Sequence, residues 1–175
     1  MEMSGERQIA APRAAVWEAL NDPTVLKECI PGCQEMERDG DGFSAVVKQK
    51  VGPVSATFKG AVTLSNVAEG ESYTISGEGK GGAAGFAKGS ADVSLADGAD
   101  GTLLTYEVEA KVGGKIAQLG GRLIDGFAKK MADQFFDRFQ EMVGGPAPEE
   151  TPAEAGDENA VEGKEKKSWL SRVTG

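Results

Sequence analysis

The sequence predicts an α+β domain in which a curved antiparallel sheet wraps around one long C-terminal helix. Three observations support this fold class. Residues 33–112 alternate apolar and polar side chains between turn signals, a pattern typical of consecutive antiparallel strands. One long amphipathic segment follows and ends near residue 143. Within residues 77–89, glycine and alanine stand where strands of a filled core carry bulky side chains.

A strand and two short helices come first. Residues 4–10 alternate as a strand, and Pro12 begins a helix whose apolar residues recur at helical spacing. Asp22 is placed to cap a second short helix over residues 23–29, because an Asp side chain accepts hydrogen bonds from the first turn. Pro31-Gly32 ends that second helix.

Six strands are expected next. Each begins and ends near glycine or aspartate turn signals, such as Asp39-Gly-Asp-Gly and Glu69-Gly. The connections are short, so neighbours in sequence should pair as antiparallel hairpins. The expected strands span residues 33–38, 43–52, 54–67, 71–80, 86–97 and 101–112.

The last element is a helix over about residues 115–143, which Gly144-Gly145-Pro146 ends. Its charged residues lie largely off one apolar stripe, so that stripe should face the sheet. This element order describes a helix-grip architecture, with a pocket between the sheet and the helix. The stripe consists of Ile116, Leu119, Leu123, Phe127, Met131, Phe135, Phe139 and Met142.

The segment Gly77–Gly89, with the sequence GEGKGGAAGFAKG, predicts an internal cavity. Alternate residues of a strand share a face, so small residues here continue the inward faces of two strands. A run of small inward residues sacrifices burial unless another molecule fills the space. The small inward residues are Gly77, Gly79, Ala87, Gly89 and Ala91.

The expected inward positions of the later strands carry no Asp, Glu, Lys or Arg, and the chain has no His. Acid–base chemistry therefore lacks its usual side chains, which argues against an enzyme. Tyr73, Tyr106 and Gln49 are the available polar anchors. The inward positions are Phe43, Ala45, Val47, Gln49, Val51, Val54, Ala56, Phe58, Val62, Leu64, Tyr73, Ile75, Val93, Leu95, Leu104, Tyr106, Val108, Ala110 and Val112.

We predict that a hydrophobic ligand lies between the sheet and the helix, because ligand pockets are largely apolar with few polar anchors. The alternative interpretation is that these inward aromatic and aliphatic side chains form a filled core without a ligand. The predicted ligand-binding residues are Val47, Phe58, Val62, Leu64, Tyr73, Ile75, Gly79, Phe86, Ala91, Val93, Leu95, Leu104, Tyr106, Leu119, Leu123, Phe127, Met131 and Phe135.

The same glycines also match a dinucleotide-binding fingerprint. Gly77, Gly79 and Gly82 have the spacing G-x-G-x-x-G, and Asp97 follows about 20 residues later. That fingerprint requires a helix directly after the glycines, whose N-terminus holds the pyrophosphate. Residues 86–97 alternate as a strand instead, which disfavours nucleotide binding.

Composition narrows the function classes further. The 175 residues carry a formal net charge of −9, with a pI of about 4.7, which argues against binding duplex nucleic acid. No run is long and apolar enough for a transmembrane helix, and residues 1–10 lack the pattern of a secretory signal. We therefore expect a cytoplasmic protein.

Cys29 and Cys33 flank Ile-Pro-Gly and are the only cysteines. A zinc site would need further Cys or His ligands, so no metal site is expected. Two reduced thiols beside a turn are the simpler interpretation, and a regulatory disulfide remains open.

The composition changes after residue 143, so we divide the chain into a domain at 1–143, a linker at 144–163 and a tail at 164–175. The linker holds six carboxylates, no Lys or Arg and almost no bulky apolar residue, which is typical of a disordered tether. The tail reverses the charge and contains one tryptophan, which predicts weak binding to an anionic membrane surface. The predicted membrane-binding residues are Lys164, Lys166, Lys167, Trp169, Leu170, Arg172 and Val173.

Several ordered motifs resemble the CoxG family of carbon monoxide dehydrogenase accessory proteins, which belongs to the START-like, polyketide-cyclase-like helix-grip superfamily. The resemblance covers about residues 1–143. The matching motifs are Cys29-Ile-Pro-Gly-Cys33, KVGPVSATFKG at 50–60, the glycine-rich segment at 77–89, GGKIAQLGGRLIDG at 113–126 and ADQFF at 132–136.

The resemblance implies a non-enzymatic accessory protein of a molybdenum-containing CO dehydrogenase or a related hydroxylase. It further implies a role in attaching that enzyme to the inner face of the cytoplasmic membrane, and in carrying a quinone of the menaquinone or ubiquinone type. No covalent cofactor, metal or catalytic residue is implied. A docking or assembly subunit without ligand, or a cyclase- or hydrolase-type enzyme of the same superfamily, are the alternatives.

Overall fold

A computed structural model of the protein describes residues 1–144, of which Met1–Phe139 form one compact unit. The expected basic tail and all but Gly144 of the expected linker lie outside the described residues.

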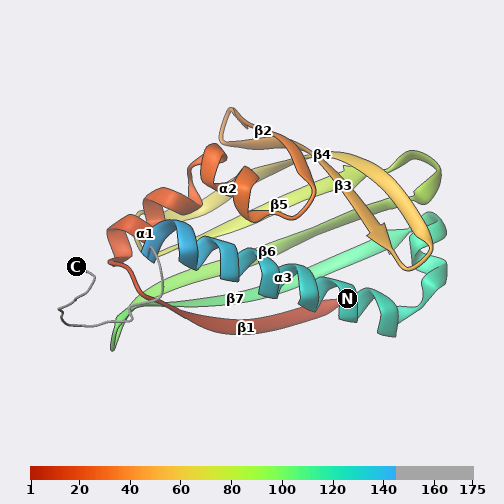
Figure 1. Ribbon diagram of the computed structural model, residues 1–175. Helices are drawn as coiled ribbons and strands as arrows, with labels where there is room; N and C mark the ends of the chain where they lie inside the picture. The colour runs from red at the N-terminus through yellow and green to blue at the C-terminus, as the bar shows by residue number, and fades with distance from the viewer. Residues whose placement is uncertain (145–175) are drawn as a thin grey trace, which may run out of the picture. The chain divides into compact units, whose positions relative to one another are not determined.

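The sheet has seven antiparallel strands in the order β1-β7-β6-β5-β4-β3-β2 (Figure 1). Strands β2 to β7 pair as successive hairpins, and β1 completes the sheet by pairing with β7. The predicted strands and the predicted fold class are confirmed, with ends that differ by one or two residues. The strands are β1 (Glu2–Ile9), β2 (Cys33–Asp39), β3 (Gly42–Val51), β4 (Val54–Ala68), β5 (Ser72–Lys80), β6 (Phe86–Gly98) and β7 (Gly101–Gly113).

Two short helices, α1 (Arg13–Leu20) and α2 (Pro23–Cys29), connect β1 to β2. The predicted cap is present, since the Thr24 amide donates to the Asp22 carboxylate at 2.9 Å. The long helix α3 (Gly121–Gly144) runs along the same face of the sheet as α1 and α2 (Figure 1). Two short 3-10 helices, η1 (Gly82–Ala84) and η2 (Gly114–Leu119), complete the elements.

The long helix begins later than the sequence predicts. The expected start near Lys115 falls in η2, and α3 begins at Gly121. The reason is Gly120, whose φ of 93° is incompatible with a right-handed helix and is adopted readily by glycine. Ile116 and Leu119 therefore belong to a separate turn, so the predicted stripe is not one continuous helical face.

A filled core lies where β1, β7, α1 and α3 contribute their most deeply buried side chains. Ile9, Val16, Leu104 and Phe139 are almost completely inaccessible to solvent. Thr102 is buried among them, and its hydroxyl donates to the Ala11 carbonyl at 2.7 Å, so its polar atom is satisfied. Ile9, Val16, Thr102 and Phe139 therefore exclude water without a ligand.

The uncharged inward face expected for the later strands is present on β3, β4, β5 and β7, but Arg38 of β2 lies over the inward Phe43 ring at 4.7 Å, and Asp97 ends the inward face of β6. The first strand, β1, also carries a charged residue inward. Arg7 lies on the half-buried face of β1, and its guanidinium forms an ion pair with Asp133 of α3. The same guanidinium lies 5.2 Å from the centre of the Phe136 ring. The alternation of β1 places Arg7 inward, and the helical carboxylate makes that position tolerable.

Candidate functional site

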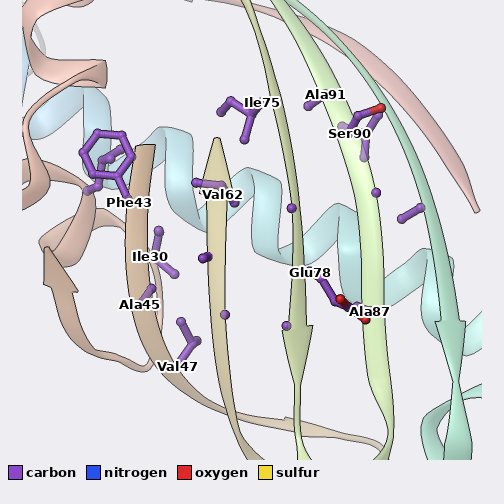
Figure 2. A pocket seen from close by; sticks show the side chains of 18 of the residues that line it. Ile30, Phe43, Ala45, Val47, Val62, Ile75, Glu78, Ala87, Ser90 and Ala91 are labelled. Carbon is purple, nitrogen blue, oxygen red and sulfur yellow. The ribbon is translucent and has the colours of Figure 1, made fainter. Parts of the chain in front are cut away.

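A cavity of about 550 Å³ lies between the sheet, α2 and α3, a size typical of pockets for small hydrophobic molecules. Figure 2 shows short alanine side chains beside the larger Phe43, Val62 and Ile75 on its wall. The residues that border it are Leu20, Leu26, Ile30, Met36, Phe43, Ala45, Val47, Phe58, Gly60, Ala61, Val62, Leu64, Tyr73, Ile75, Gly77, Glu78, Gly79, Ala87, Lys88, Gly89, Ser90, Ala91, Val93, Leu104, Val108, Glu109, Ala110, Phe135 and Phe136.

The floor of the cavity consists of small residues that the strand register brings together. Gly79 of β5 pairs with Gly60 of β4 on one side and with Ala87 of β6 on the other. In the adjacent row, Gly89 pairs with Gly77 and with Ala110 of β7. The glycines and alanines of the segment 77–89 thus lie beside Gly60 and Ala110 and form one patch that extends over four strands.

Two different reasons explain why glycine occupies the positions of this floor. A Cβ at Gly60, Gly77 or Gly89 would collide with the backbone of the neighbouring strand, so close approach of strands explains these residues. A Cβ at Gly79 would meet only the Phe58 Cβ, at 4.0 Å. Nothing in the backbone requires glycine there, and the position opens directly into the cavity.

Aromatic residues of α3 form the opposite wall. Phe135 and Phe136 border the cavity, with ring centres 5.1 Å apart in an edge-to-face arrangement. Tyr106 stacks on Phe136 at 5.4 Å, and Arg7 packs against the same ring. Phe136 is therefore held on three sides, which fixes this wall before any ligand binds.

Only one of the three predicted polar anchors borders the cavity. Tyr73 does so, and burial raises the pKa of its hydroxyl, which stays protonated as a hydrogen-bond donor. Gln49 instead donates to the Pro31 carbonyl and ties the loop after α2 to β3. Tyr106 is buried against Phe136.

Three charged residues border the cavity without lying on its inward face. Glu78, Lys88 and Glu109 are exposed and stand at positions of their strands that alternate with the inward ones. Their neighbours on the inward face are glycine, alanine and valine. The inward lining is therefore almost entirely apolar and lacks a pair of titratable groups for acid–base chemistry.

The structure places eleven of the predicted ligand-binding residues at the cavity. They are Val47, Phe58, Val62, Leu64, Tyr73, Ile75, Gly79, Ala91, Val93, Leu104 and Phe135.

Seven predicted residues lie away from the cavity. Leu95 and Tyr106 are buried in the packed core, and Phe86 lies on the outer face, where its ring covers Gly113 of the paired strand. The other four belong to η2 or the first half of α3, whereas the cavity meets α3 only at Phe135 and Phe136. Leu123 is 41% exposed and packs over Gly52. These four are Leu119, Leu123, Phe127 and Met131.

Sequence reasoning missed the residues that α1, α2 and β2 add to the wall. Leu20, Leu26, Ile30 and Met36 are spread over short elements, and each element by itself shows only that it has a buried side. Phe136 was missed because Phe135 fits the helical stripe and its neighbour does not. The signal available for Phe136 was the aromatic pair itself.

Cys29 and Cys33 are not joined by a disulfide in the structure. Cys29 is completely buried, and burial raises the pKa of its thiol to about 11. Cys33 is partly exposed and donates to the Glu35 carbonyl at 3.2 Å, and burial raises the pKa of its thiol as well. Neither thiol is activated as a nucleophile.

The buried thiol predicts a loss of stability at alkaline pH. An unfolded cysteine releases its proton near pH 9, while folded Cys29 retains it to about pH 11, so the free energy of unfolding should fall between these values. We expect a loss of about 2 kcal/mol from this group, measured by urea unfolding at pH 8 to 11. Tyr73 acts in the same direction, so Cys29→Ala is the control. An equally steep decline in that variant would contradict the assignment.

Within residues 1–144, no helix is long and apolar enough to cross a membrane. The same part of the chain contains no group of three or more His, Cys, Asp or Glu side chains that could hold a metal ion.

Comparison with protein families gives one match over most of the chain. The family model that describes CoxG of carbon monoxide dehydrogenase matches residues 5–144. A search of curated proteins found no match.

Solved structures agree on the fold. A conserved protein from Geobacillus kaustophilus is 28% identical, with a TM-score of 0.77 over 82% of this chain and 95% of that one. A START superfamily protein from Mycobacterium smegmatis is 17% identical, with a TM-score of 0.61 over 82% and 97%. A protein from Thermus thermophilus is 14% identical, with a TM-score of 0.61 over 85% and 100%. The last two likenesses concern the fold alone.

Proposed function

The chain belongs to the CoxG family of carbon monoxide dehydrogenase, and from that membership we propose that it is a non-enzymatic accessory protein that carries a hydrophobic isoprenoid quinone for its partner enzyme. The partner would be a molybdenum-containing CO dehydrogenase or a related hydroxylase. The observation that carries the proposal is the apolar cavity of about 550 Å³, whose floor is kept open by Gly79 and its small neighbours.

The lining suits such a ligand. An isoprenoid chain gains affinity by burial alone, at about 25 cal/mol per Å² of apolar surface, so no specific polar network is required. A quinone ring adds carbonyl acceptors, and Tyr73, which borders the cavity, keeps a protonated hydroxyl that can donate a hydrogen bond. We therefore assign Tyr73 the role of contacting the ring.

The lining favours binding over the two alternatives. A cyclase or hydrolase would place carboxylates or other acid–base groups on the inward face, whereas the carboxylates and the lysine bordering this cavity face outward. A pure docking subunit would have no reason to keep Gly79 and Ala87 beside open space, because filling it would stabilise the domain.

Mass spectrometry of lipid extracted from the natively purified protein tests the ligand assignment. We expect a quinone to be recovered in a fixed ratio to the protein, because transfer of a long isoprenoid chain back to water is unfavourable. Protein purified in the same way after Gly79→Leu substitution is the control. Recovery of fatty acids or phospholipids alone would contradict the quinone, and an empty cavity would support a docking subunit.

The membrane half of the proposal concerns residues 164–175. Four basic residues around Trp169 would bind an anionic surface weakly and reversibly, at about 1 kcal/mol per basic residue. We expect the full chain to co-sediment with anionic liposomes at low salt, and a chain ending after Gly145 to bind less. Equal sedimentation of the two chains would show that the tail is no anchor.

A further inference from the structure

The outer face of the sheet, opposite the cavity, has its lysines collected at one end by the strand register. Lys59 pairs with Lys80, which pairs with Phe86, and in the next row Glu78 pairs with Lys88, which pairs with Lys111. Two lysines of β3 extend this group toward the β3–β4 turn. The lysine patch consists of Lys48, Lys50, Lys59, Lys80, Lys88 and Lys111, all exposed.

The arrangement of these lysines is unfavourable for the domain by itself. Lys59 and Lys80 stand directly opposite each other, as do Lys88 and Lys111, and like charges at such positions destabilise a sheet. Within residues 1–144, none of the six forms an ion pair. Glu78 stands beside Lys88, and the two other carboxylates of these rows, Glu35 and Glu37, lie on the edge strand β2, separated from the paired lysines by β3. An external negative surface would remove this repulsion.

The chemistry of the patch fits a lipid bilayer better than a protein partner. Protein interfaces favour arginine, whose planar fork binds carboxylates in a bidentate manner, and are depleted in lysine. The patch contains lysine and no arginine, and flexible ammonium groups suit the mobile phosphates of lipid headgroups. Phe86 lies among the lysines with 40% of its surface exposed, and an exposed aromatic side chain is suited to the interfacial region.

Carboxylates at the other end of the outer face would orient the domain. Asp92 pairs with Glu107, and Glu2 pairs with Glu109, in rows that follow the lysine rows along β6, β7 and β1. An anionic bilayer repels this half of the face and attracts the other. The domain would therefore approach with its lysine end foremost.

We propose that the lysine patch around Phe86 is a second membrane-binding surface, by which the folded domain itself contacts an anionic bilayer. The inference rests on the proposed membrane association and adds a contact that residues 164–175 do not provide. The two contacts would act together, since binding by one raises the effective concentration of the other at the surface.

The test is co-sedimentation of the full chain with vesicles of 30% phosphatidylglycerol in phosphatidylcholine at low salt. The patch variant is K59Q/K80Q, which also relieves the repulsion between the two lysines and should fold normally. The matched control is K27Q/K130Q, which makes the same change of charge on α2 and α3. A tail variant, K166Q/K167Q, reports the other contact.

We expect the patch variant to partition roughly ten- to thirtyfold less than the unmodified chain, and the matched control within about twofold of it. Sedimentation of the patch variant equal to that of the unmodified chain overturns the inference. A full chain that does not sediment at all overturns both membrane contacts. Bound quinone is measured in the same patch variant by mass spectrometry of extracted lipid. If quinone is retained, a negative sedimentation result concerns the membrane contacts alone and leaves the carrier function standing.

Discussion

Replacement of Gly79 by leucine is expected to remove the bound hydrophobic ligand while leaving the fold intact. The Cβ at this position has open space, with the Phe58 Cβ at 4.0 Å as its only neighbour, so the leucine side chain would occupy the cavity. We expect at least about a tenfold loss of quinone, which corresponds to about 1.4 kcal/mol of binding free energy. The melting temperature should stay constant or rise, because the new side chain buries apolar surface.

Two further leucine variants on β5 make this result interpretable. Ser76→Leu places the same side chain on the outer face and should retain the ligand. Gly77→Leu points inward but collides with the backbone at Ala61, so it should unfold the sheet locally and lower the melting temperature. Quinone retention by Gly79→Leu equal to that of Ser76→Leu would show that the ligand lies elsewhere.

Truncation of Phe139 to alanine is expected to cause the largest loss of stability. Its side chain is completely buried, and its ring stacks on Phe135 at 5.7 Å, next to the cavity wall. Loss of a buried phenyl ring removes its transfer free energy and leaves a void, which together cost about 3–5 kcal/mol. Urea or thermal unfolding measures this loss.

The matched control on α3 is Leu123→Ala. Leu123 is 41% exposed, so its truncation should cost no more than about 1 kcal/mol. A loss below about 1 kcal/mol for Phe139→Ala would mean that the helix is not held to the domain by this side chain. A loss for Leu123→Ala as large as that for Phe139→Ala would mean that the first half of α3 is held as tightly as Phe139.

The sequence by itself determined the elements and their inward faces. Alternation between turn signals located β2 to β7, and the cap at Asp22 located α2, because each of these signals acts within a few residues. The small inward residues at 77–91 also indicated a cavity. The motifs at 29–33, 50–60, 77–89 and 113–136 identified the family.

The tertiary structure decided which of these residues meet. Gly60 and Ala110 join the floor through the register of β4 with β5 and of β6 with β7, which depends on how each turn pairs two strands and not on the residues of one strand. The structure also separated glycines that avoid a backbone collision, such as Gly77, from Gly79, which borders open space. In the sequence these two residues are equivalent.

The placement of α3 was likewise decided by tertiary packing. A helical stripe marks which residues are apolar, but a helix that crosses a curved sheet meets a given site over only one or two turns. Gly120 separates Leu119 from the helix, and within α3 the cavity meets Phe135 and Phe136 and not Leu123, Phe127 or Met131. Periodicity is a property of the helix alone, whereas the point of contact depends on the sheet that it crosses.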